Sequence, residues 1–313
     1  MPELTIHIED SFYEREERCN YVIEKNVKKL WAVQLDLLGV LRRVCQNHNI
    51  KYYACAGTLL GAARHNGYIP WDDDLDVMMF RSDYDKLCEI ASMGEFTEPY
   101  FFQTEYTDPG TLRGHAQLRN SSTTGIIKSE FQGHYSFNQG VFIDIFPIDN
   151  VPDSTEERIE FLSALNVMKS KMMRYANLTY WYSGNLSTGI TNSVKKVLHP
   201  ITYSIEKKLH LLRAMYSKYE KMMKRYNNVD TQFVGITALS QHGDRFMWPR
   251  EVFKGKDKVL SFEMFDILAP NNYAATLKLS YGDWETPIKS AAVHGSLIFN
   301  TDISYTDFLE KMK

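Results

Sequence analysis

The sequence has few cysteines, no long hydrophobic run and no excess of basic residues, and each shortage excludes a class of protein. Its four cysteines in 313 residues include no C-x-x-C pair, so they fit neither a zinc knuckle nor a disulfide framework and indicate a reducing compartment. No stretch approaches the roughly 18 apolar residues of a membrane span, and the N-terminal residues lack the apolar core of a signal peptide. A formal net charge of -3 argues against a nucleic-acid-binding protein. We therefore expect a cytoplasmic protein with no nucleic-acid partner.

What is present is the composition of an ordinary globular protein. Hydrophobic residues make up 44% and charged residues 24% of the chain, which is enough for a sizeable core without disulfides. No internal repeat or low-complexity segment is visible. We expect three parts: a core with an N-terminal helix (1–150), a helical insertion (151–230) and a C-terminal segment that packs back on the core (231–313).

Short strands and helices alternate within the first 150 residues. Apolar residues at three- and four-residue spacing predict a helix over 21–49. Short β-prone runs predict strands over 52–56, 75–80 and 141–148, and a helix is expected over 83–91. This order indicates an α+β core.

The second half of the chain is mostly helical. A helical pattern starts at residue 155, and apolar residues over 205–226 recur every 3.5 residues along one face. A β-like run covers 259–268, and a further helix is expected over 272–279.

The most informative ten residues read WDDDLDVMMF, from 71 to 80. Side chains alternate along a strand, so Asp74 and Asp76 are expected on one face, which Asp72 joins only if the strand begins early. Two carboxylates on one face repel each other, and a divalent cation between them relieves the repulsion. Oxygen ligands without histidine or cysteine favour Mg²⁺ or Mn²⁺. A solvated turn is the alternative; it suits Asp72 and Asp73 but not Asp76.

A third carboxylate, Asp144, lies in the middle of the apolar run VFIDIF. Burying a carboxylate in a central strand costs several kcal/mol unless it is paired or metal-bound. Pairing with an arginine, or capping of a backbone amide, is the alternative to metal binding. Asp149 follows Pro147 and is expected in a turn.

Gly57 and Thr58 stand between a predicted strand and a predicted helix. Glycine lets a phosphate approach the backbone, and the free N–H groups at a helix start favour anions. Taken alone, the pair reads equally as a tight turn and a helix N-cap. Combined with the strand aspartates, it is typical of two-metal phosphoryl or nucleotidyl transfer.

The run YYACAGTLLGAARHNGYIPWDDDLDVMMFRSDYDKL, at 52–87, resembles the signature of the LicD family. That family comprises bacterial phosphocholine transferases and relatives, and it is similar to the fukutin group of sugar-phosphate transferases. The resemblance resumes at 116–124, 140–149 and 270–287, and nothing over 155–230 is recognised.

The resemblance implies a nucleotidyltransferase fold, with a small mixed β-sheet flanked by helices and an added helical insertion. It also implies roles for individual residues. Gly57 and Thr58 match a phosphate-contacting turn, Asp74 and Asp76 a metal-binding pair, and Asp144 a third carboxylate. Arg64 and His65 match an R-H dipeptide, and Arg119 is the arginine of a later motif.

The reaction implied by the resemblance uses a CDP-activated donor, CDP-choline by default, and two Mg²⁺ or Mn²⁺ ions. A sugar hydroxyl of a cell-surface glycan precursor, of the lipopolysaccharide or teichoic acid kind, attacks the phosphorus that carries choline, and CMP leaves. Asp144 would accept the hydroxyl proton, while Arg64 and Arg119 would brace phosphate oxygens. His65 either carries a proton or orients an aspartate.

Three other functions stay open. CDP-ribitol or CDP-glycerol could replace CDP-choline within the same family. A D-x-D glycosyltransferase also binds a nucleotide diphosphate through a metal, but it requires neither Gly57-Thr58 nor Asp144. A pseudoenzyme that only binds nucleotide is disfavoured because all three carboxylates are intact.

Aromatic side chains are candidates for holding choline, because a quaternary ammonium is recognised by aromatic faces. Trp181 lies in the cluster Tyr180–Tyr182, and Trp71 and Trp284 are competing candidates. Ordinary packing of these rings is the alternative.

The segment 195–225 is strongly basic. Nine lysines and arginines stand against Glu206 and Glu220, a local net charge of +7 in a chain whose net charge is -3. The basic face is either solvated or rests on anionic lipid, which attracts basic residues. In the second case Lys207, Lys218 and Lys221 would face the inner surface of the cytoplasmic membrane, where a lipid-linked acceptor would lie.

Overall fold

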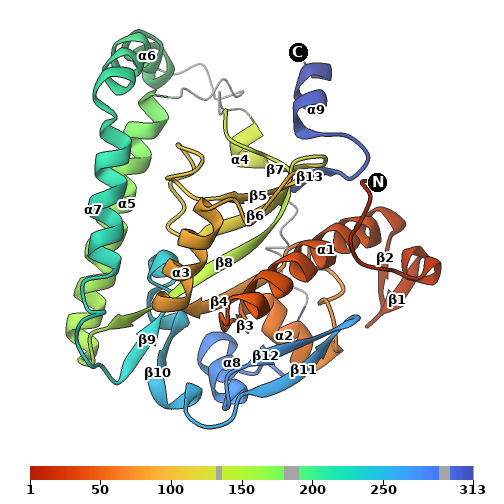
Figure 1. The fold of residues 1–313 in the computed structure, drawn as a ribbon. Helices are drawn as coiled ribbons and strands as arrows, with labels where there is room; N and C mark the ends of the chain where they lie inside the picture. The colour runs from red at the N-terminus through yellow and green to blue at the C-terminus, as the bar shows by residue number, and fades with distance from the viewer. Residues whose placement is uncertain (132–135, 180–189, 289–296, 313) are drawn as a thin grey trace.

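The computed structural model describes residues 1–131, 136–179, 190–288 and 297–312. Within them a mixed sheet of seven strands forms the centre of the molecule (Figure 1). Five strands follow the order β10-β9-β8-β4-β3; β6 pairs with β8, and β5 with β6. Their bounds are Tyr53–Ala54 (β3), Asp76–Phe80 (β4), Tyr100–Gln103 (β5), Ala116–Asn120 (β6), Val141–Val151 (β8), Phe233–Gly235 (β9) and Met247–Pro249 (β10).

Three two-stranded sheets and nine α-helices complete the described part of the chain. The sheets are β1 Glu16–Arg18 with β2 Tyr21–Ile23, β11 Lys258–Phe262 with β12 Phe265–Ala269, and β7 Thr124–Ile127 with β13 Leu297–Asn300. The helices are α1 Lys25–Asn47, α2 Ala56–His65, α3 Arg81–Ser92, α4 Lys128–Phe131, α5 Thr155–Thr179, α6 Ile190–Leu209, α7 Leu211–Met223, α8 Tyr273–Tyr281 and α9 Tyr305–Lys311. Short 3₁₀ helices cover Asp10–Tyr13, Thr237–Phe246 and Arg250–Phe253.

The sheet has a hydrophobic core on each face because successive side chains of β4 and β8 point to opposite sides. Val77 and Ile145 belong to the core that contains α1, whereas Met78 and Phe146 belong to the core that contains α5 and α7. Helices therefore cover both faces (Figure 1). The expectation of a small mixed sheet flanked by helices is confirmed, and the division into three parts stays a prediction.

Most elements occur where periodicity predicts them. The first helix, α1, begins at Lys25 because Tyr21–Ile23 form β2, and the β-like run over 259–268 is the hairpin of β11 and β12. Two further details differ. The face over 205–226 is broken at His210, whose φ of 48° is left-handed and separates α6 from α7. Asp149 lies inside β8 and not in a turn, fully buried against Arg81, whose Nε and Nη2 donate to its two oxygens at 2.7 Å each. A buried ion pair satisfies a carboxylate that the sequence pattern had assigned to solvent.

None of the helices in the described ranges combines the length and apolarity needed to cross a bilayer.

Candidate active site

Two aspartates lie side by side on the central strands. β4 and β8 run parallel, and Asp76 is directly opposite Asp144 in their register. The backbone N–H of Asp144 donates to the carbonyl of Leu75 at 2.9 Å, which fixes this pairing. Register partners in parallel strands project to the same face of the sheet. The two carboxylates, far apart in sequence, therefore share one site.

Helix α2 packs its first turn against the start of β4. The Thr58 hydroxyl accepts a hydrogen bond from the backbone N–H of Asp76 at 2.8 Å. A Cβ at position 57 would lie 2.6 Å from Oδ2 of Asp72, so only glycine leaves this space open. Cys55, which directly precedes α2, is the N-cap and makes no side-chain cap hydrogen bond. The turn thus places a helix start without a side-chain cap beside carboxylates, and its contact with a phosphate stays a prediction.

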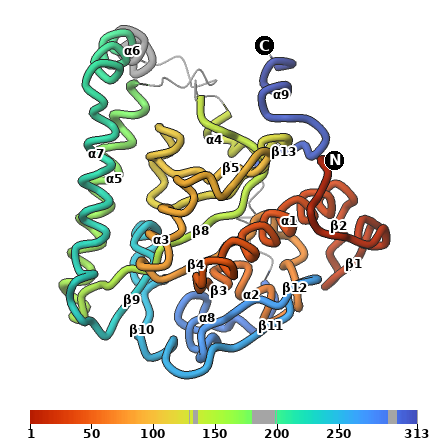
Figure 2. Tube along the Cα trace, viewed as in Figure 1, coloured from red at the N-terminus to blue at the C-terminus, as the bar shows by residue number. Residues whose placement is uncertain are grey.

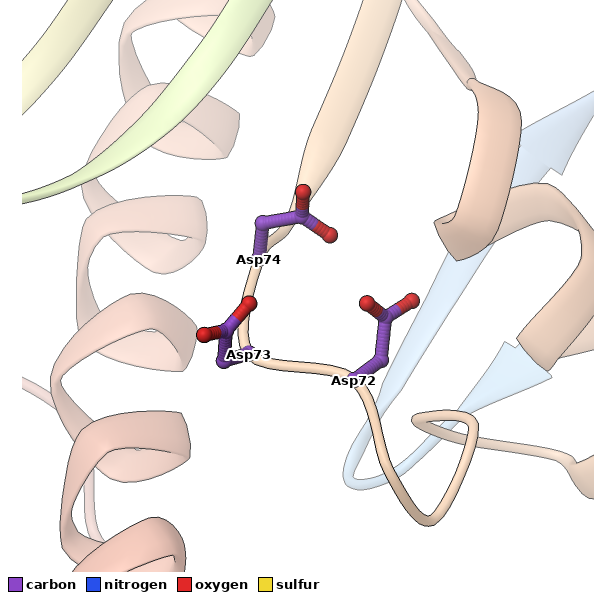
Figure 3. A group of neighbouring side chains, drawn as sticks. All are labelled: Asp72, Asp73 and Asp74. Carbon is purple, nitrogen blue, oxygen red and sulfur yellow. The ribbon is translucent and has the colours of Figure 1, made fainter. Parts of the chain in front are cut away.

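Three further aspartates cluster in the loop before β4 (Figure 3). One carboxylate oxygen from each of Asp72, Asp73 and Asp74 lies within 4.8 Å of the others. Helix α1 holds the loop from behind: the Trp31 indole N–H donates to the Asp72 carbonyl at 3.0 Å, and the Gln34 amide donates to the Asp73 carbonyl at 2.8 Å.

The strand begins later than the sequence suggests, because Asp74 lies in the loop and only Asp76 is in β4. Figure 3 shows the Asp72 and Asp74 carboxylates reaching into the same space from two sides of the loop. From the sequence, Asp72 was expected to share a face with Asp74 and Asp76 only if the strand began early. The structure instead brings Asp72 to the site through the bend of the loop. In the sequence, the run of four aspartates was the feature that could have predicted a role for Asp72.

The carboxylates repel one another strongly. Burial raises the pKa of Asp76 well above its ordinary value, and the charges of Asp74, Asp144 and Asp72 raise it further. Burial likewise raises the pKa of Asp72, with added repulsion from Asp74 and Asp73. A hard divalent cation would neutralise this charge, and a set made only of carboxylate oxygens is what Mg²⁺ or Mn²⁺ prefers. The residues present therefore fit such an ion.

Asp144 is positioned by β6 and the residue preceding it. Nε2 of His115 lies 2.9 Å from Oδ1 of Asp144, and the Gln117 amide donates to the same oxygen at 2.7 Å. Burial would raise the pKa of Asp144, but the His115 and Gln117 contacts outweigh it and lower that pKa. Sequence reasoning missed both residues. Their alternate spacing at the start of β6 was the available signal, and it points to Asp144 only once the pairing of β6 with β8 is known.

Arg119 lies in the sheet and not at an open phosphate site. Its side chain is fully buried. Its guanidinium donates to Oε1 of Gln103 at 2.6 Å, to the Gly140 carbonyl at 2.7 Å and to Oε1 of Gln117 at 2.5 Å. A phosphate contact would require it to leave these partners. Arg119 instead fixes the Gln117 amide, which in turn holds Asp144.

Arg64 and His65 end helix α2, whereas Gly57 and Thr58 begin it. At a rise of 1.5 Å per residue, Arg64 lies about 9 Å along the axis from Thr58. Arg64 donates to the Trp284 carbonyl at 2.9 Å and to Nε2 of His65 at 2.9 Å. Burial, followed by the charges of Arg64 and Arg18, lowers the pKa of His65 to about 4. The structure thus does not bring this pair to the carboxylates, and a neutral His65 accepts from Arg64.

The candidate choline-binding tryptophans have different surroundings. Trp71 directly precedes the aspartate loop, is half-buried and meets Tyr21 edge to face at 5.9 Å between ring centroids. Trp284 packs against the core that contains α1. Trp181 lies outside the described residues. Of the two described candidates, Trp71 is the one that adjoins the carboxylates in sequence.

A cavity of about 700 Å³ lies at the opposite ends of β4 and β8, lined by residues that include Phe80, Arg81 and Arg250. Four residues along a strand separate Asp76 from Phe80, a span of roughly 13 Å. This cavity is therefore distinct from the carboxylate site.

Comparison with known proteins places the site within a family. Residues 49–177 match a family model described as the LicD/FKTN/FKRP nucleotidyltransferase domain. The lipopolysaccharide cholinephosphotransferase LicD of Haemophilus influenzae is 27% identical over 260 residues, which cover 80% of this chain and 88% of that protein. An uncharacterized protein of Rickettsia prowazekii is 47% identical over 60 residues, about 20% of each chain, and one of Rickettsia typhi is 42% identical over 62 residues. The predicted resemblance is confirmed: residues 49–177, which contain all the aspartates of this site, are a domain of the LicD family.

Proposed function

We propose that this protein transfers phosphocholine, or a similar phospho-alcohol, from a CDP-activated donor to a sugar hydroxyl of a cell-surface glycan precursor and releases CMP. The similarity to a lipopolysaccharide cholinephosphotransferase extends over most of both chains. The observation that carries the proposal is the pairing of Asp76 with Asp144 beside the aspartate loop and the uncapped start of α2. We also infer that the mixed sheet is that of a nucleotidyltransferase fold.

In this proposal Asp72, Asp74, Asp76 and Asp144 hold two Mg²⁺ or Mn²⁺ ions. When bound, such ions neutralise charge on the diphosphate and stabilise the attacking and leaving oxygens. The acceptor oxygen bonds to the phosphorus that carries choline, and the bond from that phosphorus to the CMP oxygen breaks. Asp144 takes the hydroxyl proton, and its carboxylate is kept in place by His115 and Gln117.

The chain's own residues also prepare the site before substrate arrives. The Thr58 hydroxyl ties α2 to the first residue of β4, and Gly57 keeps the space in front of Asp72 free of side-chain atoms. Trp31 and Gln34 hold the loop backbone. Preorganised groups of this kind need little rearrangement when charge develops.

A thermal-shift screen of cytidine diphosphate compounds tests the donor. We expect CDP-choline with Mg²⁺ to raise the melting temperature, since a ligand at a hundredfold excess over Kd stabilises the folded state by about 2.7 kcal/mol. CDP-ribitol and CDP-glycerol test the other head groups, and UDP-sugars test the glycosyltransferase alternative. The Asp76→Asn variant is the control, because its response to Mg²⁺ and donor should be lost. A shift with UDP-sugars alone would contradict the proposal.

A further inference from the structure

Helix α5 carries a lysine in the middle of its buried face. Its buried residues Leu162, Leu165, Met172 and Ala176 recur at three- and four-residue spacing, and Lys169 takes the position between the second and the third of them. Residues at this spacing lie on one side of a helix. Figures 1 and 2 show α5 beside α7 at one side of the sheet. Lysine rarely occupies a packed face without a partner, so this position requires an explanation.

The Lys169 ammonium is surrounded by carbonyl oxygens. Nζ donates to the Arg113 carbonyl at 3.4 Å and to the Ala238 carbonyl at 3.2 Å, and within the described chain it has no carboxylate partner. Burial and, to a smaller extent, the charge of Arg113 lower the pKa of Lys169 to about 8, so the amine is still mostly protonated at neutral pH. A largely enclosed charge without a counter-ion is costly, and an anionic ligand would supply the missing charge.

A second cation, Arg113, lies on the loop that joins β5 to β6. The buried Glu105 carboxylate holds this loop by accepting from the backbone N–H of Gly110 at 3.0 Å. Nη2 of Arg113 lies 2.7 Å from Oε1 of Glu130, which offsets the charge of Arg113. Nε of Arg113 is enclosed and has no hydrogen-bond partner among the residues that the structure describes. Arg113 therefore keeps one donor available, and the charge of Lys169 stays uncompensated.

Both cations lie close to the Asp144 site. His115 follows Arg113 by two residues, and its Nε2 lies 2.9 Å from Oδ1 of Asp144. Burial lowers the pKa of His115, Asp144 opposes that shift, and the charges of Arg113 and Lys169 lower the pKa further. The side chains of Arg113, His115 and Asp144 are 11%, 13% and 15% exposed. Solvent therefore reaches this group of side chains, and so can the charged end of a ligand.

We propose that Lys169 and Arg113 form a phosphate-binding subsite beside Asp144, and that this subsite holds a phosphate group of the CDP-activated donor. The identity of the donor rests on the proposed function, whereas phosphate binding does not. Ammonium and guanidinium groups are the side chains that bind phosphate oxygens through charge-assisted hydrogen bonds. The subsite takes over the phosphate contacts expected of Arg64 and Arg119, which donate to protein oxygens instead.

Inorganic phosphate tests the subsite without cytidine and without transfer. The full chain is titrated with phosphate in Mg²⁺ at constant ionic strength, and the melting temperature reports binding. We expect phosphate to raise the melting temperature of the wild type. Lys169→Met and Arg113→Gln should each raise the Kd for phosphate by about tenfold or more, because each removes a charge-assisted hydrogen bond. Lys169→Arg, which keeps the charge, should retain more of the affinity than Lys169→Met.

The matched control is Lys171→Met, since Lys171 is an exposed lysine on the same helix. Its Kd for phosphate should equal that of the wild type. In phosphate-free buffer, Lys169→Met should melt at the wild-type temperature or above it, because it removes an uncompensated charge. Three results would overturn the subsite: a wild type that phosphate does not stabilise, an unchanged Kd in Lys169→Met and Arg113→Gln, or an equal loss of affinity in Lys171→Met.

CDP-choline separates the subsite from the proposed reaction. Displacement of phosphate by CDP-choline, together with weaker CDP-choline binding in Lys169→Met, supports a donor subsite. Phosphate binding that requires Lys169 but is not displaced by CDP-choline would overturn the assignment to the donor and leave a subsite for another phosphate. A wild type that binds CDP-choline as tightly as Lys169→Met does, and does not bind phosphate, would overturn the subsite and leave the proposed function intact.

Discussion

Asp76→Asn and Asp144→Asn are each expected to lower kcat by about 10³-fold or more, because each change removes a charge that stabilises the transition state while keeping the side-chain shape. The two variants should differ in stability. Asp76 is buried among Asp72, Asp74 and Asp144, so losing its charge should raise the melting temperature in metal-free buffer. Asp144 is favourably bonded to His115 and Gln117 and should gain nothing.

Initial rates at saturating Mg²⁺ and melting curves in a chelator check both statements. Asp266→Asn is the control, since this exposed acid lies in β12, and it should leave rate and stability unchanged. Near-normal turnover of either site variant would rule out the proposed metal ligands.

Asp149→Asn is expected to cost about 3–5 kcal/mol of unfolding free energy, because it leaves a buried Arg81 guanidinium without its counter-charge. The fully buried Asp149 carboxylate also accepts from the Asn227 amide at 2.7 Å and the Thr237 hydroxyl at 2.6 Å. Three separate chain segments, which contain Arg81, Asn227 and Thr237, therefore meet at this one carboxylate of β8.

Urea denaturation measures the loss. Asp85→Asn is the matched control, because Asp85 lies 3.8 Å from the same arginine with a side chain that is 47% exposed; a pair of this kind contributes at most about 1 kcal/mol. A loss of less than about 1 kcal/mol in Asp149→Asn would show that the pair does not hold the sheet together.

Most strands and helices of the described chain could be predicted from the sequence, because their signals are local. Alternation identified β4 and β8, and a charge inside VFIDIF marked Asp144 as a residue that needs a partner. The partners of Asp144 could not be predicted from the sequence, because His115 and Gln117 reach Asp144 only through the pairing of β6 with β8.

Arginine roles were the least predictable. Arg119 and Arg64 were both expected to brace phosphates, yet Arg119 is enclosed by the sheet and Arg64 binds backbone carbonyls after α8. A guanidinium can satisfy either protein oxygens or phosphate oxygens, and the sequence does not distinguish them. The same holds for Asp149, whose buried partner Arg81 is 68 residues away.

Transfer of phosphorus is the most direct test of the proposed function. CDP-choline labelled with ³²P at the phosphorus next to choline, and with ¹⁴C in the choline, is incubated with Mg²⁺ and a lipopolysaccharide that lacks phosphocholine. We predict that both labels enter the glycan in equal amounts and that one CMP is released for each. A glycan that gains sugar from a nucleotide sugar in a parallel reaction, but no phosphorus from CDP-choline, CDP-ribitol or CDP-glycerol, would contradict the account.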